Sequence, residues 1–325
     1  MKINKSIRDS YSDLSISYKK LKKRVDDYLS NSINDKWHYI SRIKELESFA
    51  LKIESGRYPS IETFDDFFAC SIVVEKLSNI EEAEKLVKDR FVFIERKPVN
   101  INYTHKRPDS FPFDDLRLYV KWKDPHGIRP TGIDDLLFEV QIKTFLQHAW
   151  GIATHDLIYK TDEVNWSKER IAYQIKAMLE HAEVSILEAE NLSKSSFLKK
   201  SNKDTNQICK IIKLLTEIWE KPNLPSNIKL LAIQIDSLLK KLSITEADLK
   251  EILINETVNN LGTKALNLSP FAIIIQSLFN QIPNKMFKSF KKCDKRYSLF
   301  VHSEIDIPKT IDISKLKGIV RYEEE

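Results

Sequence analysis

The chain has 325 residues, of which 42% are hydrophobic and 30% charged, and its formal net charge is +5. This length suits two domains, and the apolar share is enough to form buried cores. The positive charge is too small to identify a nucleic-acid-binding protein by itself. The three cysteines, Cys70, Cys209 and Cys293, lie far apart, which argues against a zinc site or a disulfide framework.

The N-terminal segment is polar and lacks the apolar core of a signal peptide. No stretch approaches about 18 uninterrupted apolar residues, so we expect no membrane span and a cytoplasmic protein. Only six glycines occur. This scarcity favours a helix-rich chain and argues against a glycine-rich phosphate-binding loop.

Apolar residues at helical spacing predict an amphipathic helix over residues 6–31 and a second helix over residues 40–53. The first helix carries a basic run within residues 19–24. We interpret this run as a solvated helix face, with contact to RNA as the alternative.

A mixed pattern of strands and helices follows. Strands are expected at 70–74, 91–94, 116–122 and 136–142, and helices at 80–89 and 144–160. This succession predicts an α+β fold with a small mixed sheet of about four strands, flanked by helices.

After residue 162 the pattern becomes almost purely helical. Helices are expected at 166–196, 207–220, 226–241, 245–260 and 270–282, with one or two strands within 297–322. We therefore expect a first domain over residues 1–165 and a helical C-terminal region over residues 166–325, with a second candidate boundary near 200. The helical region carries no functional motif, and regulation and oligomerisation both remain open for it.

Polar residues gather at the end of the α+β part. Side chains alternate along a strand, so Glu139, Gln141 and Lys143 share one sheet face while their neighbours face the core. On the helix that follows, His148 and His155 project from one side together with a tyrosine. We interpret this arrangement as a polar site on a rigid floor; the alternative is a surface helix with incidental histidines.

Residues 138–160, FEVQIKTFLQHAWGIATHDLIYK, resemble the E-[VI]-Q-I-[RK]-T signature, with its trailing W, H and YK, of the RelA/SpoT alarmone synthetase family. Residues 42–52 are similar to that family's R-x-K-x-x-E-S-x-x-x-K adenine-nucleotide motif. Residues 66–74 are similar to its D-[IL]-[AV]-G-[IV]-R-[IV]-V motif. The three motifs cover roughly residues 36–165, and the resemblance implies a nucleotidyltransferase-like domain.

The family transfers the β,γ-pyrophosphate of ATP to a ribose 3′-hydroxyl, and such chemistry needs Mg²⁺. The resemblance implies Asp66 and Glu139 as metal ligands, with Asp65 ranked lower. It implies these catalytic residues: Asp66, Glu139, Gln141 and His155. It implies these ATP-binding residues: Arg42, Lys44, Ser48, Lys52 and Arg57. Acceptor-binding candidates are Phe113, Arg117, Lys143, His148, Tyr159 and Lys160.

Two departures concern the acceptor side. Where the family has G-Y-R-S-[LI]-H, residues 112–117 read PFDDLR, so glycine is replaced by Pro112 and histidine by Arg117. The arginine of the 66–74 motif is replaced by Ser71. Arg117 is a candidate source of the lost positive charge, and the identity of the acceptor stays open.

Three functions therefore compete. The first is synthesis of an alarmone from ATP and GDP or GTP. The second is a toxin-like pyrophosphorylation of the tRNA 3′ end, for which a basic run over 285–296 with Phe287 and Phe290 offers charge and stacking. The third is an inactive module that binds nucleotide or a regulatory protein, and a homo-oligomer is also open. No long His/Asp-bearing helical region precedes the motifs, so we expect transfer without hydrolase activity.

Overall fold

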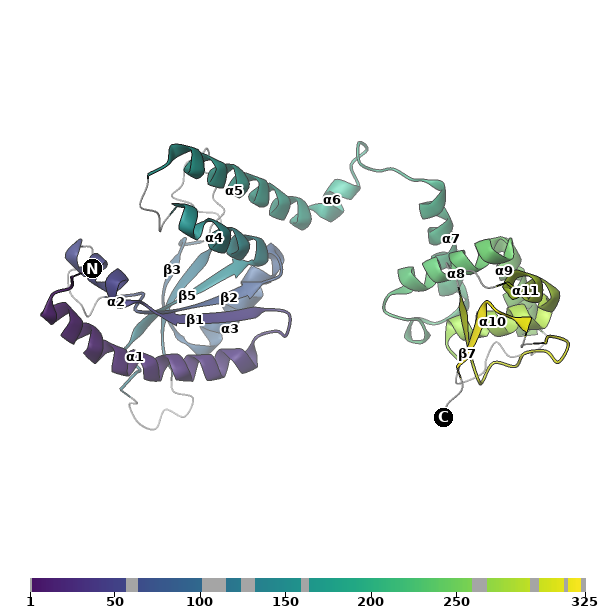
Figure 1. The fold of residues 1–325 in the computed structure, drawn as a ribbon, viewed down its shortest axis with the longest axis horizontal. Coiled ribbons are helices and arrows are strands. Elements are labelled where there is room, and N and C mark those ends of the chain that lie inside the picture. The colour runs from purple at the N-terminus through teal and green to yellow at the C-terminus, as the bar shows by residue number, and fades with distance from the viewer. Residues whose placement is uncertain are drawn as a thin grey trace. The chain divides into compact units, whose positions relative to one another are not determined.

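The computed structural model describes residues 2–56, 64–100, 115–123, 132–158, 164–258, 268–292, 298–312 and 315–322, without the side chains of 155–158 and 321–322. The chain divides into two compact units, Met1–Leu198 and Lys199–Glu325 (Figure 1). The division lies near the second candidate boundary, and residue 165 falls inside the first unit. Whether residues 1–165 suffice for function stays a prediction.

The first unit contains a sheet and the helices that cover it. Its elements are α1 (Lys5–Ser32), β1 (His38–Ile43), α2 (Leu46–Glu54), β2 (Phe68–Val74), η2 (Leu77–Asn79), α3 (Ile80–Arg90), β3 (Val92–Lys97), β4 (Leu116–Lys121), β5 (Leu137–Thr144), α4 (Phe145–Ile158), α5 (Trp166–Leu187) and α6 (Ala189–Ser193). The strand order is β1-β2-β5-β4-β3. β2 and β5 run parallel and the other neighbours antiparallel, which confirms the predicted α+β fold with a mixed sheet.

The sheet has one strand more than we expected, because β1 was taken for the start of a helix. The prediction of a continuous helix over 40–53 is wrong: β1 pairs with β2, and α2 begins only at Leu46. Exposure alternates along β1, as in an edge strand. The spacing of three between Ile40 and Ile43 fits a helix, but pairing with β2 overrides this local pattern.

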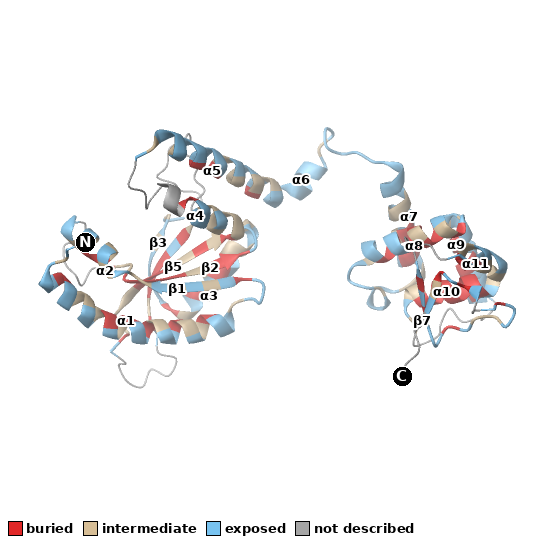
Figure 2. Cartoon of the chain, viewed as in Figure 1, coloured by how far each residue is buried: buried red, intermediate tan, exposed pale blue. Residues whose placement is uncertain are grey.

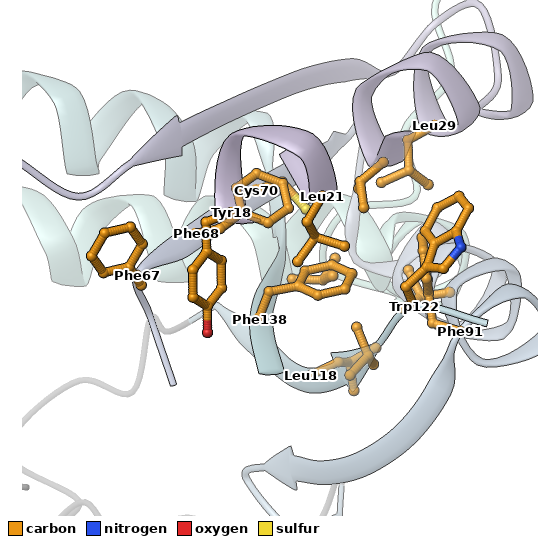
Figure 3. Packing of buried hydrophobic residues seen from close by; sticks show 14 of the residues in the cluster. Tyr18, Leu21, Leu29, Phe67, Phe68, Cys70, Phe91, Leu118, Trp122 and Phe138 are labelled. Atoms are coloured by element: carbon orange, nitrogen blue, oxygen red, sulfur yellow. The ribbon is translucent and has the colours of Figure 1, made fainter. Parts of the chain in front are cut away.

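One face of the sheet packs against α1 and α3 to form the core. Figure 3 shows Leu21 of α1 close to Phe138 of β5 and Leu118 of β4, all fully buried. The rings of Phe68 and Phe138 lie 5.2 Å apart between centroids. Burial of this apolar surface stabilises the sheet as a rigid support for the residues on its other face.

On the other side of the sheet lie α4 and α5 (Figure 1). The indole Nε1 of Trp150 donates to the carbonyl oxygen of Ala172 at 3.2 Å, and Thr144 Oγ1 donates to Glu183. The amine of Lys176 lies 5.2 Å from the Trp150 ring centroid. These contacts make α5 part of the first unit. Figure 2 shows buried positions concentrated in the strands and exposed positions along α1 and α5.

The second unit is mostly helical, as predicted. It contains α7 (Lys203–Ile218), η4 (Lys221–Asn223), α8 (Ile228–Leu242), α9 (Glu246–Val258), α10 (Pro270–Gln281), α11 (Pro283–Phe290) and the parallel pair β6 (Leu299–His302) and β7 (Ile319–Tyr322). The interpretation of Phe290 as an RNA-stacking residue is wrong, because Phe290 is fully buried; Phe287 is partly buried against the same core. Among the described helices of both units, none is long and apolar enough to cross a membrane.

Candidate active site

Strand register brings the polar residues of three strands together on the face away from α1. Glu139 of β5 pairs with Ala69 of β2 on one side and with Tyr119 of β4 on the other. Two residues further along β5, Gln141 pairs with Arg117. The expected polar surface on β5 therefore continues onto β4.

Glu139 is almost completely buried and lies at the centre of this surface. Its Oε2 atom accepts a hydrogen bond from the hydroxyl of Tyr119 at 3.1 Å, and its Oε1 atom accepts one from the Gln141 amide. The Nη1 atom of Arg117 lies 3.7 Å from Oε2. Glu139 is thus held by two donors and lies beside a cation.

Gln141 connects Glu139 to further residues of the site. Its Oε1 atom accepts from the Lys143 amine at 2.7 Å and from the Ser71 hydroxyl at 3.4 Å. Ser71 thus contacts the site at the position where the family motif has arginine. Burial lowers the pKa of Lys143; Asp115 opposes this shift and Arg117 adds to it.

Asp66 forms a second cluster with two cations of the predicted ATP motif. Its Oδ2 atom accepts from the Lys44 amine at 2.7 Å and also from the Lys52 amine. Burial tends to raise the pKa of Asp66, but the hydrogen bonds from Lys44 and Lys52 hold it below its usual range. Burial lowers the pKa of Lys44, partly opposed by Asp66. Arg42 of β1 lies near enough to lower the pKa of both Lys44 and Lys143.

The second carboxylate oxygen of Asp66, Oδ1, is a candidate ligand for the expected Mg²⁺. Oδ1 is buried and has no hydrogen-bond partner in the described part of the chain. A buried anionic oxygen without a donor fits a hard divalent cation such as Mg²⁺. Within the described residues, no group of three or more histidine, cysteine or acidic side chains is arranged to hold a metal ion. Magnesium is commonly held by one or two carboxylates together with substrate phosphates and water, so Asp66 fits this role.

Arg117 is shared between two acids. Its Nε atom lies 3.5 Å from Asp115 Oδ1, on the opposite flank from Glu139. Burial alone would lower the pKa of Arg117, but the charges of Asp115 and Glu139 raise it above its ordinary value. Sequence analysis missed Asp115 and Tyr119. The signal was their spacing of two from Arg117, which places all three on one strand face.

The structure describes the remaining predicted site residues only in part. His148 of α4 lies near Lys143, and burial together with the charges of Lys143 and His38 lowers its pKa. Ser48 lies in α2, and no hydrogen bond joins it to another described residue of the site. The side chain of His155 lies outside the described residues. So do four whole residues: Arg57, Phe113, Tyr159 and Lys160.

Solved structures align with this chain at low sequence identity. Small alarmone synthetase 1 from Bacillus subtilis aligns with a TM-score of 0.44 and 15% identity, over 57% of this chain and 98% of its own. Small alarmone synthetase 2 from Bacillus subtilis aligns with a TM-score of 0.39 and 17% identity, over 57% of this chain and 96% of its own. A GTP pyrophosphokinase family protein from Streptococcus pneumoniae aligns with a TM-score of 0.36 and 19% identity, over 59% of this chain and 91% of its own.

No curated protein sequence matches the chain. A family model described as "Region found in RelA / SpoT proteins" matches residues 41–164. Both clusters, around Glu139 and around Asp66, fall within those residues. The first unit of this chain therefore contains a segment similar to the RelA/SpoT region, and that segment includes the candidate active site.

Proposed function

We propose that the first unit transfers the β,γ-pyrophosphate of ATP to the ribose 3′-hydroxyl of a guanosine nucleotide, in the presence of Mg²⁺. The observation that carries this proposal is the convergence of Lys44 and Lys52 on Asp66 within the segment similar to the RelA/SpoT region. A polyphosphate substrate needs such a set: cations for its charge and a carboxylate for its metal.

We assign binding of ATP, the pyrophosphate donor, to residues 42–52. Lys44 and Lys52 would hold phosphate oxygens as point charges, and Arg42 would stack on adenine or make forked contacts with phosphate. Bound Mg²⁺ would neutralise the polyphosphate charge next to Asp66. Because Asp66 already pairs with both lysines, the three side chains are held together before ATP arrives.

We assign activation of the acceptor hydroxyl to Glu139. The 3′-oxygen of the acceptor forms a bond to the β-phosphorus of ATP, the bond from that phosphorus to the α-phosphate oxygen breaks, and AMP leaves. Glu139 would orient the hydroxyl and take its proton, because hydrogen bonds to both of its oxygens hold the carboxylate in place. Arg117 and Lys143 flank this position as cations for the acceptor's phosphates.

Two alternatives have specific support. Transfer to the tRNA 3′ end is favoured by the changed residues 112–117, although Phe290 no longer supports it. An inactive nucleotide-binding module is favoured by the pairing of both key carboxylates with the chain's own donors, Asp66 with lysines and Glu139 with Tyr119. In that case the site would bind nucleotide without transfer.

One assay separates these functions. The full chain is incubated with Mg²⁺ and ATP labelled at the γ-phosphate, with GDP, GTP or bulk tRNA as acceptor. Label on a guanine nucleotide supports the proposal, and label on tRNA alone supports the second function. Binding of ATP without transfer to any acceptor supports the third and contradicts the proposal. Glu139→Gln serves as the inactive control, and Glu217→Gln, an exposed acid of the second unit, as the matched active control.

A further inference from the structure

Tyr119 contacts the central carboxylate of the site, although it lies outside the motifs that led to the site. Its hydroxyl donates to Glu139 Oε2 at 3.1 Å, and both residues are about 95% buried, with exposures of 5% and 4%. The two are direct partners in the register of β4 and β5. The position of the hydroxyl is therefore set by paired strands of the sheet.

The tyrosine ring is also held from its other neighbouring strand. The Lys97 amine of β3 lies 4.4 Å from the centroid of the Tyr119 ring, a cation–π distance. β3 and β5 flank β4 on both sides. A side chain fixed in this way aims its hydroxyl at one place, as positioning of a catalytic group requires.

The surroundings of the Tyr119 hydroxyl keep it protonated, so it acts as a hydrogen-bond donor. Burial, and then the negative charges of Glu139 and Asp65, raise the pKa of Tyr119 above its usual value. The hydroxyl thus keeps its proton throughout the physiological pH range. A protonated phenol that donates to a carboxylate fixes the orientation of that carboxylate.

We propose that Tyr119 is a positioning residue that orients Glu139 for contact with the acceptor hydroxyl. The proposal rests on the proposed function for the reaction itself. It assigns the Oε2 atom to Tyr119 and Arg117, and the Oε1 atom to Gln141. Because Tyr119→Phe removes one oxygen and keeps the ring, it isolates the hydrogen bond from the packing.

The kinetic test compares Tyr119→Phe with Tyr39→Phe in the full chain. Tyr39 is a matched control because its hydroxyl also donates to a carboxylate, Asp26 at 2.7 Å, on the opposite face of the sheet. We expect Tyr119→Phe to lower kcat about tenfold and to change KM for ATP less than about twofold. Tyr39→Phe should leave both kcat and KM unchanged. A kcat for Tyr119→Phe equal to that of the unmodified protein overturns the proposal.

A second measurement does not depend on activity. Crystal structures of the unmodified protein and of Tyr119→Phe are compared at the Glu139 carboxylate. A carboxylate that rotates or becomes disordered in Tyr119→Phe supports the proposal, and one that keeps its position overturns it. If the unmodified protein transfers label to no acceptor, the proposed function fails while this comparison still decides the role of Tyr119. Loss of the folded state in Tyr119→Phe would also overturn it, since the hydroxyl would then serve stability.

Discussion

The amine of Lys44 lies 2.7 Å from the Oδ2 atom of Asp66, a residue 22 positions further along the chain. The amine of Lys52, from α2, reaches the same oxygen. A backbone hydrogen bond of 2.8 Å from Lys44 to Phe67 fixes the two segments side by side. The cluster therefore depends on the edge pairing of β1 with β2 as much as on the charges.

Asp66→Asn should abolish transfer while leaving the protein folded. The amide cannot supply the anionic oxygen that Mg²⁺ requires, so we expect a loss of at least about a hundredfold in kcat. The labelled-phosphate assay measures the loss, and circular dichroism checks the fold. Asp65→Asn is the matched control and should keep most of the activity. If Asp65→Asn were the inactive variant and Asp66→Asn the active one, the metal ligand would be Asp65.

The same pair predicts a pH dependence of stability. The pKa of Asp66 is lower in the folded protein than in an unfolded chain, where it is about 3.9. Its contribution is therefore fully present above about pH 4 and is lost as the pH falls through the folded-state pKa. Urea unfolding should show Asp66→Asn less stable than the unmodified protein by about 1–3 kcal/mol at pH 7. The difference should shrink steadily below about pH 4, and a difference independent of pH would contradict the prediction.

Arg117→Gln should weaken the acceptor side selectively. Its guanidinium lies 3.7 Å from Glu139 and next to Asp115, so its loss leaves two acids facing the acceptor's phosphates. We expect KM for the acceptor to rise about five- to tenfold and KM for ATP to change less than about twofold. Stability should change by less than about 1 kcal/mol, because the side chain is 45% exposed. Lys121→Gln, on the same strand, is the control, and an equal rise in KM for ATP would place Arg117 on the donor side.

Sequence patterns predicted the Asp66 cluster well and the surroundings of Glu139 only in part. Lys44, Lys52 and Asp66 belong to motifs with fixed internal spacing, so they could be singled out without knowing the sheet, and their roles stay predictions. The contact between Tyr119 and Glu139 depends on the register of β4 against β5. Register follows from pairing across the whole sheet, and local spacing does not determine it.

Local sequence patterns alone were also insufficient to locate the domain boundary, which was predicted near residue 165. The helix expected over 166–196 ends at Leu187 and is followed by the short α6. Local periodicity does not tell which helix packs against which neighbour. The hydrogen bond from Trp150 to Ala172 and the burial of Lys176 are long-range features. Both assign α5 to the first unit.

This assignment predicts that a fragment of residues 1–198 is markedly more stable than a fragment of residues 1–165. The shorter fragment loses the acceptor of the Trp150 indole, leaves Thr144 without Glu183, and uncovers the side of α4 that packs on Ala172. Loss of two buried hydrogen bonds and of apolar burial costs about 2–4 kcal/mol, which corresponds to a Tm lower by roughly 5–15 °C in a unit of this size. Thermal unfolding followed by circular dichroism measures the difference.

Glu183→Gln in the 1–198 fragment, which keeps α5 in place, should lower Tm by much less than the truncation. If the two fragments unfolded at the same temperature, α5 would contribute nothing to the first unit, and residue 165 would mark its end after all.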